Sequence, residues 1–380
     1  MRIVVSGGGT AGHISPILAV LEELRRLDKN LEVLFIGSGG AMEQKILAGA
    51  GIEYVRIPAG KFRRYGRKFF DAAIDARTNW HNFRDFFRFN GGVFRAYQLV
   101  RKYKPDVVFV KGSYVGLPVG LAAKWLKIPL VLHDSDTVLG MTNKILSKSA
   151  QAVATGFPAE FYKDYGLKNI VFTGNPLRRS AIEGNKQDAR LQFELLEQKP
   201  NVLIFGGSLG AQNVNRTVFD HMEQFAKRYN VIHVVGEAEI ERARFLASRL
   251  PKDVQASYRP YSFLKQEMGM AYSVADVVVA RGGANSLSEL MHWAKPAIVV
   301  PLPTAANNEQ MKNAQYLARA GAVRVLPEKD LTGMRLLNEI EKLFAAPQDM
   351  RYLSTTIQKF AKPNAAKELA QIIYAAGAKQ

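Results

Sequence analysis

Two turns of one kind, one in each half of the 380-residue chain, most constrain what this sequence can fold into. In each turn a short apolar run leads into glycines, Gly7 to Gly9 in the first and Gly206 with Gly207 in the second, and a helix-forming stretch follows. Glycine permits close backbone approach, and a helix N-terminus presents free N–H groups to an anion. Each turn predicts a strand-to-helix connection, and the turn alone leaves open whether phosphate also binds there.

The rest of the chain alternates between short apolar runs and amphipathic stretches, which predicts parallel sheets covered by helices. We expect a first series of strands at residues 3–6, 32–36, 54–57, 107–110, 130–133, 152–155 and 170–173. A second series follows at 202–205, 231–235, 277–280, 297–300 and 323–325, with helices at 211–228, 240–249, 286–293 and 309–320. The sequence therefore predicts an α/β fold of two Rossmann-like domains, residues 1–175 and 176–350, closed by C-terminal helices over 351–380.

Several enzyme classes lose support from what the chain lacks. Neither glycine turn matches the dinucleotide fingerprint with its spaced acidic residue, or the Walker loop with its Gly-Lys-Ser/Thr ending. Cysteine is absent, which excludes disulfides, a thiolate nucleophile and cysteine-ligated metal. The sequence thus argues against a simple dehydrogenase and a P-loop NTPase.

The charge is unevenly distributed. The chain has 52 Lys and Arg against 34 Asp and Glu, a net charge of +18, which indicates an anionic partner. Half of that charge lies in residues 61–104, which hold 12 Lys or Arg, 3 Asp and 12 aromatic residues. This segment is the first place to look for the partner.

Basic and aromatic residues in one amphipathic stretch are typical of a segment that lies in a membrane interface. Two other readings stay open: helices that pack these rings inward and expose the arginines, and a nucleic-acid site, which we rank last. No apolar run of 18 residues occurs, and the first residues do not resemble a signal peptide. We expect a protein on the cytoplasmic side of the membrane.

Polar side chains gather where strands are expected to end. His13 follows the first glycine turn at a helix start, where an imidazole could take a proton from a substrate hydroxyl. His133 ends a strand and precedes Asp134 and Asp136. These carboxylates could bind a metal, recognise hydroxyls, orient His133 or cap the helix expected near Gly140.

The second half carries a denser polar segment, from Arg281 to Glu289, after the strand at 277–280. Glu289 is expected in the first turn of the helix, where its carboxylate could grip vicinal ribose hydroxyls or simply pair with the helix dipole. Gln310 lies at a second polar helix start beyond the next strand.

These motifs, in this order, resemble those of the MurG family of glycosyltransferases. The resemblance rests on the stretch from Gly7 to His13 with Pro16, on Gly112 to Val115, and on Thr142 to Lys144, and it continues in the second half. There it rests on Thr173 to Arg178, Gly206 to Ala211, Arg281 to Glu289, and Gln310 with Asn313 and Ala314. Together they span residues 3–326.

The resemblance implies a GT-B fold and an inverting transfer of GlcNAc from UDP-GlcNAc to the muramoyl 4-hydroxyl of a lipid-linked pentapeptide, in peptidoglycan synthesis. It implies no metal and no cofactor, and a peripheral protein at the cytoplasmic face of the cell membrane. His13 would be the leading base, with Asp134 as the other candidate. The substrate-binding residues implied are Thr10, Ala11, Gly12, Tyr114, Asp136, Arg178, Ser208, Leu264, Ala284, Asn285, Ser286, Leu287, Ser288, Glu289 and Gln310.

The chain departs from the family pattern at a few positions. Asp136 stands where the family usually has an asparagine, Ala11 where a glycine is usual, and Leu209 where a glutamine is common. A GT-B transferase with a diacylglycerol-type acceptor and a UDP-GlcNAc 2-epimerase therefore remain alternatives. A non-enzymatic nucleic-acid-binding protein is a third, which would leave Glu289 and Gln310 unexplained.

Overall fold

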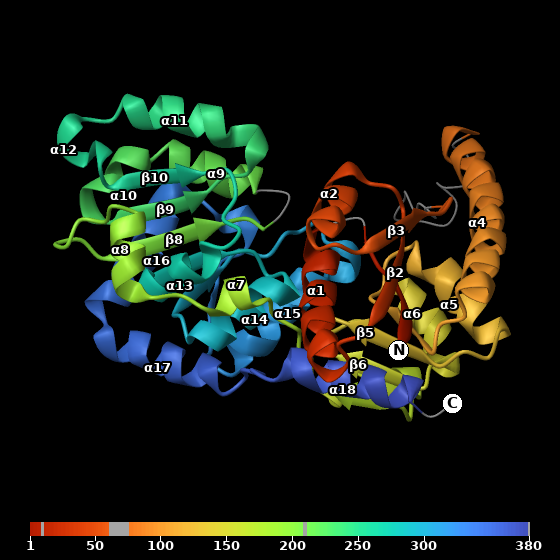
Figure 1. Cartoon of the computed structure of the whole chain (residues 1–380). Coiled ribbons are helices and arrows are strands. Elements are labelled where there is room, and N and C mark those ends of the chain that lie inside the picture. Colours follow the sequence, from red (N-terminus) through yellow and green to blue (C-terminus); the bar gives the residue numbers. More distant parts are fainter. Residues whose placement is uncertain (9–10, 61–75, 208–210, 379–380) are drawn as a thin grey trace. The chain divides into compact units, whose positions relative to one another are not determined.

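The computed structural model describes residues 1–8, 11–60, 76–207 and 211–378, and these form two compact units (Figure 1). Unit 1 comprises Met1–Pro176 and Asn364–Gln380, and unit 2 comprises Leu177–Pro363. Each unit has one sheet of parallel strands, as the sequence predicts.

The sheet of unit 1 has seven strands among the described residues, in the order β3-β2-β1-β4-β5-β6-β7. They are β1 (Arg2–Ser6), β2 (Glu32–Gly37), β3 (Glu53–Arg56), β4 (Val107–Val110), β5 (Leu130–Asp134), β6 (Ala152–Thr155) and β7 (Ile170–Phe172). The central strand β4 is apolar and buried along its whole length, as expected of a strand in a parallel sheet with both faces covered.

Alternate strand residues face different helices. Ile3, Val5 and Phe109 pack against the first helix and the last helix, whereas Val4 and Val108 are buried on the opposite face. The helices of this unit are α1 (Ala11–Leu27), α2 (Ala41–Gly49), α4 (Ala76–Tyr103), α5 (Gly116–Trp125), α6 (Met141–Leu146) and α18 (Ala365–Gly377), with short 3₁₀ turns η1 (Ser147–Ser149) and η2 (Ala159–Tyr165).

The sheet of unit 2 has six strands in the order β10-β9-β8-β11-β12-β13. They are β8 (Asn201–Phe205), β9 (Asn230–Val234), β10 (Tyr258–Tyr261), β11 (Val277–Ala280), β12 (Ala297–Val299) and β13 (Arg324–Val325). The helices are α7 (Arg179–Ile182), α8 (Lys186–Gln192), α9 (Gln212–Phe219), α10 (Met222–Arg228), α11 (Ile240–Ser248), α12 (Lys252–Gln255), α13 (Met268–Val274), α14 (Ala284–Trp293), α15 (Glu309–Arg319), α16 (Gly333–Ala345) and α17 (Pro347–Gln358), with 3₁₀ turns η3 (Glu237–Glu239), η4 (Ala306–Asn308) and η5 (Glu328–Asp330).

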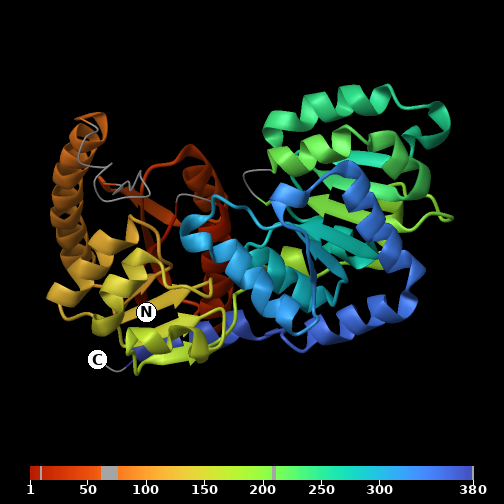
Figure 2. The same ribbon diagram turned by 180° about the vertical axis from the view of Figure 1, so that it is seen from behind.

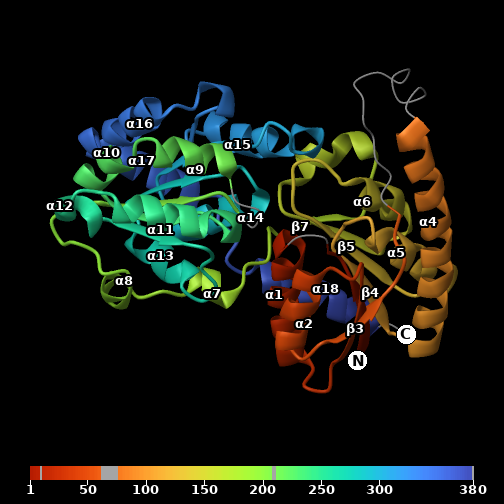
Figure 3. The ribbon, with the colours of Figure 1, turned by 90° about the horizontal axis from the view of Figure 1, so that it is seen from above.

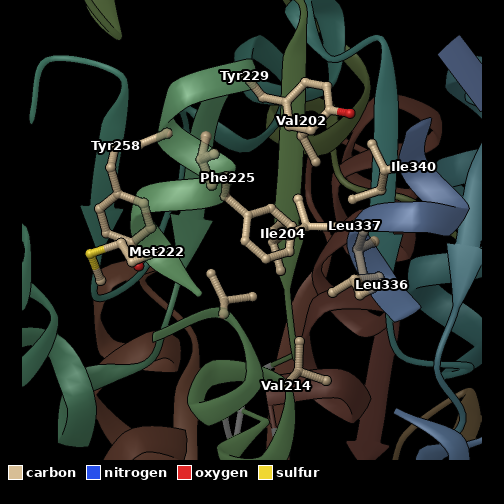
Figure 4. Close-up of a cluster of buried hydrophobic side chains, with 14 of the residues drawn as sticks. Val202, Ile204, Val214, Met222, Phe225, Tyr229, Tyr258, Leu336, Leu337 and Ile340 are labelled. Atoms are coloured by element: carbon tan, nitrogen blue, oxygen red, sulfur yellow. The ribbon is translucent and has the colours of Figure 1, made fainter. Parts of the chain in front are cut away.

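Two separate cores lie on the two faces of this second sheet. Val202 and Ile204 belong to one core with α9, α10, α11 and α16, and Figure 4 shows side chains from α9, α10 and α16 around them. Leu203 and Phe205 belong to the other core, with α8, α13, α14 and α15. Because successive side chains of β8 point to opposite faces of the sheet, alternate residues pack against different sets of helices.

The two C-terminal helices belong to different units. Leu353 and Ile357 of α17 are buried in the cores of unit 2, whereas Leu369 and Ile373 of α18 are buried against α1 and β4 in unit 1 (Figure 2). The resemblance to the family implies that the C-terminal helices over 351–380 return to the first domain; α18 packs on unit 1, whereas the apolar side chains of α17 meet α14 and α16 of unit 2.

Helix α4 runs along α5 on the surface of unit 1 (Figure 3). Val93, Ala96 and Val100 form its buried stripe, while Phe87 and Phe94 are 59% and 65% exposed. Of the predicted basic and aromatic segment, residues 61–75 lie outside the described residues. No helix in the described part of the chain is long and apolar enough to cross a membrane.

Three local predictions were wrong. The helix predicted over 211–228 is divided into α9 and α10 at Asp220 and His221. Pro16 lies inside α1 rather than at its start, since the helix already begins at Ala11. The edge strand β10 was missed because its sequence, Tyr258 to Tyr261, contains a proline and little apolar patterning.

Candidate active site

Both sheets reverse their strand order next to a glycine turn. In unit 1 the reversal lies between β1 and β4, and in unit 2 it lies between β8 and β11. Open α/β sheets bind ligands at such points, beyond the carboxyl ends of the strands. The predicted site residues of each unit follow these strands and the strands beside them.

The first glycine turn is closely packed from two sides. A Cβ on Gly7 would lie 2.9 Å from Cδ1 of Ile17 and 3.2 Å from the carbonyl oxygen of Lys111, and a Cβ on Gly8 would lie 2.6 Å from Oε1 of Glu43. Only glycine fits both positions without a shift of its neighbours. The turn leads into α1, whose first residues are Ala11 and Gly12; Thr10 lies outside the described residues.

His13 lies in the first turn of α1. The pKa of its imidazole is lowered to about 4, because burial and the positive charge of Lys111 lower it by more than a hydrogen bond to the backbone carbonyl of Lys111 raises it. The imidazole is therefore neutral at pH 7, which is the form that can accept a proton.

Lys111 follows β4 directly, and its side chain is only 3% exposed. Its ammonium group donates a hydrogen bond to Oγ of Ser135. Burial lowers the pKa of Lys111, and the negative charges of Asp134 and Asp136 raise it. A cation and two carboxylates thus share one buried cluster beside His13.

Asp134, at the end of β5, is held by donors from the start of α6. Its Oδ2 accepts the backbone N–H of Gly140 at 2.8 Å and the Nδ2 of Asn143 at 2.9 Å. The pKa of Asp134 is raised to about 6, because burial and the nearby charge of Asp136 raise it by more than the two donors and Lys111 lower it. Of the roles left open for this carboxylate, the geometry favours fixing the start of α6.

The remaining predicted residues of unit 1 surround this cluster. His133 is fully buried, its Nε2 lies 3.1 Å from the carbonyl oxygen of Gly174, and burial holds its pKa well below the usual value. Tyr114 precedes α5 and is half-buried, next to Ser113 with its φ of 67°. The carbonyl of Asp136 accepts a hydrogen bond from Tyr162 at 2.7 Å. The predictions for unit 1 therefore converge on one edge of its sheet.

In unit 2 the second glycine turn leaves β8 through Gly206 and Gly207. A Cβ on Gly206 would lie 2.2 Å from Cβ of Ala211, and Gly207 has a φ of 82°, so both positions require glycine. Ser208 lies outside the described residues.

The segment that follows β11 is fixed by polar and close backbone contacts. Arg281 is buried, donates to the carbonyl oxygen of Val300 at 3.1 Å and forms an ion pair with Glu328. Gly283 caps α14, and a Cβ on Gly282 would lie 2.5 Å from the carbonyl oxygen of Gln310. The starts of α14 and α15 are thus held close together.

Five residues predicted to line the donor site form the first turns of α14. Ala284 and Leu287 are buried, and the others are half-buried; the five are Ala284, Asn285, Ser286, Leu287 and Ser288. Ser288 Oγ donates to the carbonyl oxygen of Ala284 at 2.8 Å.

Glu289 lies in the second turn of α14, not in the first as predicted, because the helix begins at Ala284. Its Oε2 accepts a hydrogen bond from the hydroxyl of Tyr272 at 2.8 Å. The pKa of Glu289 is raised to about 7, because burial raises it by more than the hydrogen bond from Tyr272 lowers it. The effect of the helix dipole fades beyond the first turn. The position of Glu289 therefore argues against the alternative that its carboxylate only pairs with the positive end of the helix dipole.

Tyr272 is itself fixed by aromatic contacts. Its ring is fully buried, stacks on Trp293 with centroids 6.4 Å apart, and meets Phe205 edge-on at 5.9 Å. Trp293 in turn donates to the carbonyl oxygen of Ala181 at 2.7 Å. The position of the Glu289 carboxylate therefore depends on a rigid aromatic group.

The other predicted residues of unit 2 lie on separate elements. Gln310, in the first turn of α15, accepts the backbone N–H of Leu302 at 3.0 Å through its Oε1. Leu264 is buried with its side chain in the core that also holds Tyr272. Arg178 is half-buried and caps α7.

Two residues with close contacts to this site were missed. Lys111 has a recognisable sequence signal, since a lysine directly follows four buried strand residues and precedes a glycine. Tyr272 has none, because an aromatic residue within an apolar helix is indistinguishable from an ordinary core residue. In the described part of the chain no group of three or more His, Asp or Glu is arranged to hold a metal ion.

Comparison with known proteins identifies relatives along nearly the whole chain. Residues 3–155 match the model of the glycosyltransferase family 28 N-terminal domain, and residues 201–369 match that of the C-terminal domain. The chain is 33% identical over 374 residues to the UDP-N-acetylglucosamine--N-acetylmuramyl-(pentapeptide) pyrophosphoryl-undecaprenol N-acetylglucosamine transferase of Bacillus cytotoxicus, and the match covers 98% of both chains.

Solved structures agree with this similarity. The crystal structure of MurG from Acinetobacter baumannii matches with a TM-score of 0.72 and 26% identity, covering 98% of this chain and 99% of the other. A UDP-GlcNAc 2-epimerase from Neisseria meningitidis matches with a TM-score of 0.65 over the whole of both chains, but at 13% identity this is a likeness of fold alone.

Proposed function

The chain belongs to glycosyltransferase family 28 and, within it, to the MurG transferases, and from this premise we propose how and where it carries out their reaction. It is a UDP-sugar glycosyltransferase of GT-B fold. It transfers GlcNAc from UDP-GlcNAc to the muramoyl residue of undecaprenyl-diphospho-MurNAc-pentapeptide, a step of peptidoglycan synthesis. The observation that carries this function is the 33% identity over 98% of both chains.

We propose that unit 2 binds the donor. Glu289 accepts hydrogen bonds from the ribose hydroxyls, since a carboxylate has about four lone-pair sites and Tyr272 uses one. The N–H groups at the starts of α14 and α15 and in the second glycine turn, with Ser208, face the diphosphate. The backbone of Leu264 meets the uracil, and Arg178, Gln310 and residues 284–288 complete the site.

Unit 1 presents the acceptor and the base. His13 takes the proton of the muramoyl 4-hydroxyl as that oxygen attacks the anomeric carbon of GlcNAc, and the bond to UDP breaks on the opposite face, which inverts the configuration. Its neutral imidazole suits this role, and the two donors on Asp134 suit that carboxylate less. Residues 10–12, Tyr114 and Asp136 border the reacting sugars.

The transfer is tested by incubating the protein with labelled UDP-GlcNAc and lipid I and separating the products. We expect a lipid-linked disaccharide and free UDP. Turnover of UDP-GlcNAc without any acceptor would indicate the epimerase, and product with diacylglycerol but not with lipid I would indicate the other transferase. Either result, against an active MurG control, overturns the assignment.

We also propose that the basic and aromatic segment, residues 61–104, binds anionic lipid at the cytoplasmic face of the cell membrane. The described part supports this, because the exposed rings of Phe87 and Phe94 share a face of α4 with the exposed Arg101, seven residues further on, and the exposed Arg88 and Arg95 lie directly beside that face. A role in cell shape and cell division would follow from cell wall synthesis.

Liposome co-sedimentation tests the membrane proposal. Binding should rise with the fraction of anionic lipid, and replacing Phe87 and Phe94 by serine should weaken it by about a hundredfold or more, because each ring contributes about 1.5–3 kcal/mol when buried. The double replacement of Leu191 and Phe245, exposed on unit 2, is the matched control. Binding that ignores anionic lipid, or that the Phe87 and Phe94 replacements leave unchanged, contradicts the proposal.

A further inference from the structure

We propose that Lys111 is a positioning residue for the transfer reaction, a buried cation that ties His13 to the loop carrying Asp134 and Asp136 and allows both carboxylates to be ionised together. The inference rests on the proposed function, since it assumes that His13 works as the base. It goes further because it gives a role to a residue that touches neither sugar.

The backbone of Lys111 connects the strand edge to His13. Its N–H donates to the carbonyl oxygen of Ser6 at 2.8 Å, which continues the pairing of β4 with β1 by one residue. Its own carbonyl accepts a hydrogen bond from the His13 imidazole and packs against Gly7. A displacement of Lys111 would therefore move the proposed base.

The side chain of Lys111 reaches the next strand. The ammonium group bonds to Ser135, the residue between the two carboxylates, and the charges of both carboxylates act on it. Because the side chain is 3% exposed, it is not placed to contact a substrate. A buried ammonium group is costly unless anions compensate it, and ionising the buried Asp134 beside the half-buried Asp136 is costly unless a cation compensates them.

The groups facing this cluster come from four elements. They are His13 from α1, His133, Asp134 and Asp136 from β5 and the residues after it, Tyr162 from η2, and Lys111 itself after β4. Burial keeps the pKa of His13 and that of His133 low, so neither imidazole adds positive charge at pH 7. In this described cluster Lys111 supplies the cation that compensates the two carboxylates.

Replacing Lys111 by methionine keeps the length of the side chain and removes the charge. In full-length protein assayed with lipid I, we expect kcat to fall by about tenfold or more as the base loses its alignment. The acid limb of the pH profile should move up by about one unit, since the lost cation raises the pKa of Asp134. The KM for UDP-GlcNAc should change by less than about twofold, because unit 2 carries the donor residues.

Two further variants separate this role from simple packing. Lys111→Arg keeps the cation and should restore most of the activity. Lys111→Met combined with Asp136→Asn restores the charge balance, and the double variant should have a pH profile closer to the wild type than Lys111→Met alone. Lys45→Met, at an exposed lysine of α2 in the same unit, is the matched control.

A double-mutant cycle in urea, with no substrate present, decides the inference even if transfer to lipid I is not found. Lys111→Met and Asp136→Asn should each destabilise the protein, and together they should cost less than the sum of the two. Additive losses, or a Lys111→Met variant with unchanged kcat and pH profile, would overturn the proposal. Failure of the wild type to glycosylate lipid I would instead refute the proposed function.

Discussion

The two sheet edges share one framework but differ in the chemistry they hold. The edge of unit 1 gathers ionisable side chains, the half-buried His13 and the buried Lys111 and Asp134, and the charge of Lys111 acts on the other two. The edge of unit 2 offers helix starts and one carboxylate, Glu289, held by the neutral hydroxyl of Tyr272. The difference fits the proposal that unit 1 carries the base of the reaction and unit 2 binds the nucleotide sugar.

His13→Ala should have the largest effect and should sharpen this contrast. Loss of the base is expected to lower kcat by about 10²–10⁴-fold, the usual contribution of general base catalysis. The affinity for UDP, measured by calorimetry, should stay unchanged because the donor residues lie in unit 2. Normal turnover in this variant would show that His13 is not the base and would favour Asp134, the other candidate.

Glu289→Ala should show the opposite pattern. A hydrogen bond to a charged group contributes about 1.5–3 kcal/mol, so UDP should bind about tenfold to hundredfold more weakly. Calorimetry checks this against Glu241→Ala, which removes an exposed carboxylate of the same unit. Equal affinity in the Glu289 variant and the wild type would exclude the ribose contact.

The pH dependence of donor binding tests the same carboxylate without removing it. Since burial raises the pKa of Glu289 to about 7, the group is protonated below that pH and ionised above it. The ionised form is the stronger acceptor, so affinity for UDP-GlcNAc should rise by up to about tenfold between pH 6 and pH 8. The diphosphate diester has no ionisation of its own in this range.

A matched variant separates Glu289 from other titrating groups. In Glu289→Gln, binding of UDP-GlcNAc should be independent of pH over the same range. A pH dependence that persists in this variant would assign the titration to another residue.

Tyr272→Phe should have the smallest effect of the four. It removes the hydroxyl that positions Glu289 while keeping the stacked ring, so we expect a loss of about two- to tenfold in UDP affinity, the value of a single hydrogen bond. Tyr229→Phe, at another buried tyrosine of unit 2, is the control. A larger effect than that of Glu289→Ala would mean that the ring, rather than the carboxylate, governs the site.

The sequence was sufficient to predict every described strand of both sheets except β10, and the sheet edges where the proposed site residues lie. Buried parallel strands such as β4 and β11 are short and wholly apolar, and glycine turns mark where two of them end. The split of the helix at Asp220 was not predictable, because its apolar spacing continues across the break.

Site details that depend on distant contacts were predicted less well. Glu289 was placed one turn too early because the helix was predicted to begin at residue 286, whereas α14 begins at Ala284. The ionisation of Asp134 depends on Asn143 and Lys111, residues 9 and 23 positions away. The order of strands in the sheet brings these residues together, and the spacing of residues along the sequence does not reveal it.

The return of α18 to unit 1 sets the order in which the two units can be completed during synthesis. Unit 2 is one continuous stretch, Leu177–Pro363, and holds all of its own core when residue 363 has emerged. Unit 1 begins first but lacks Leu369, Ala370 and Ile373, which cover α1 and β4, until the last residues are made. The unit that carries the proposed base is therefore finished last, and a chain truncated before Asn364 would lack that cover while its donor half stayed whole.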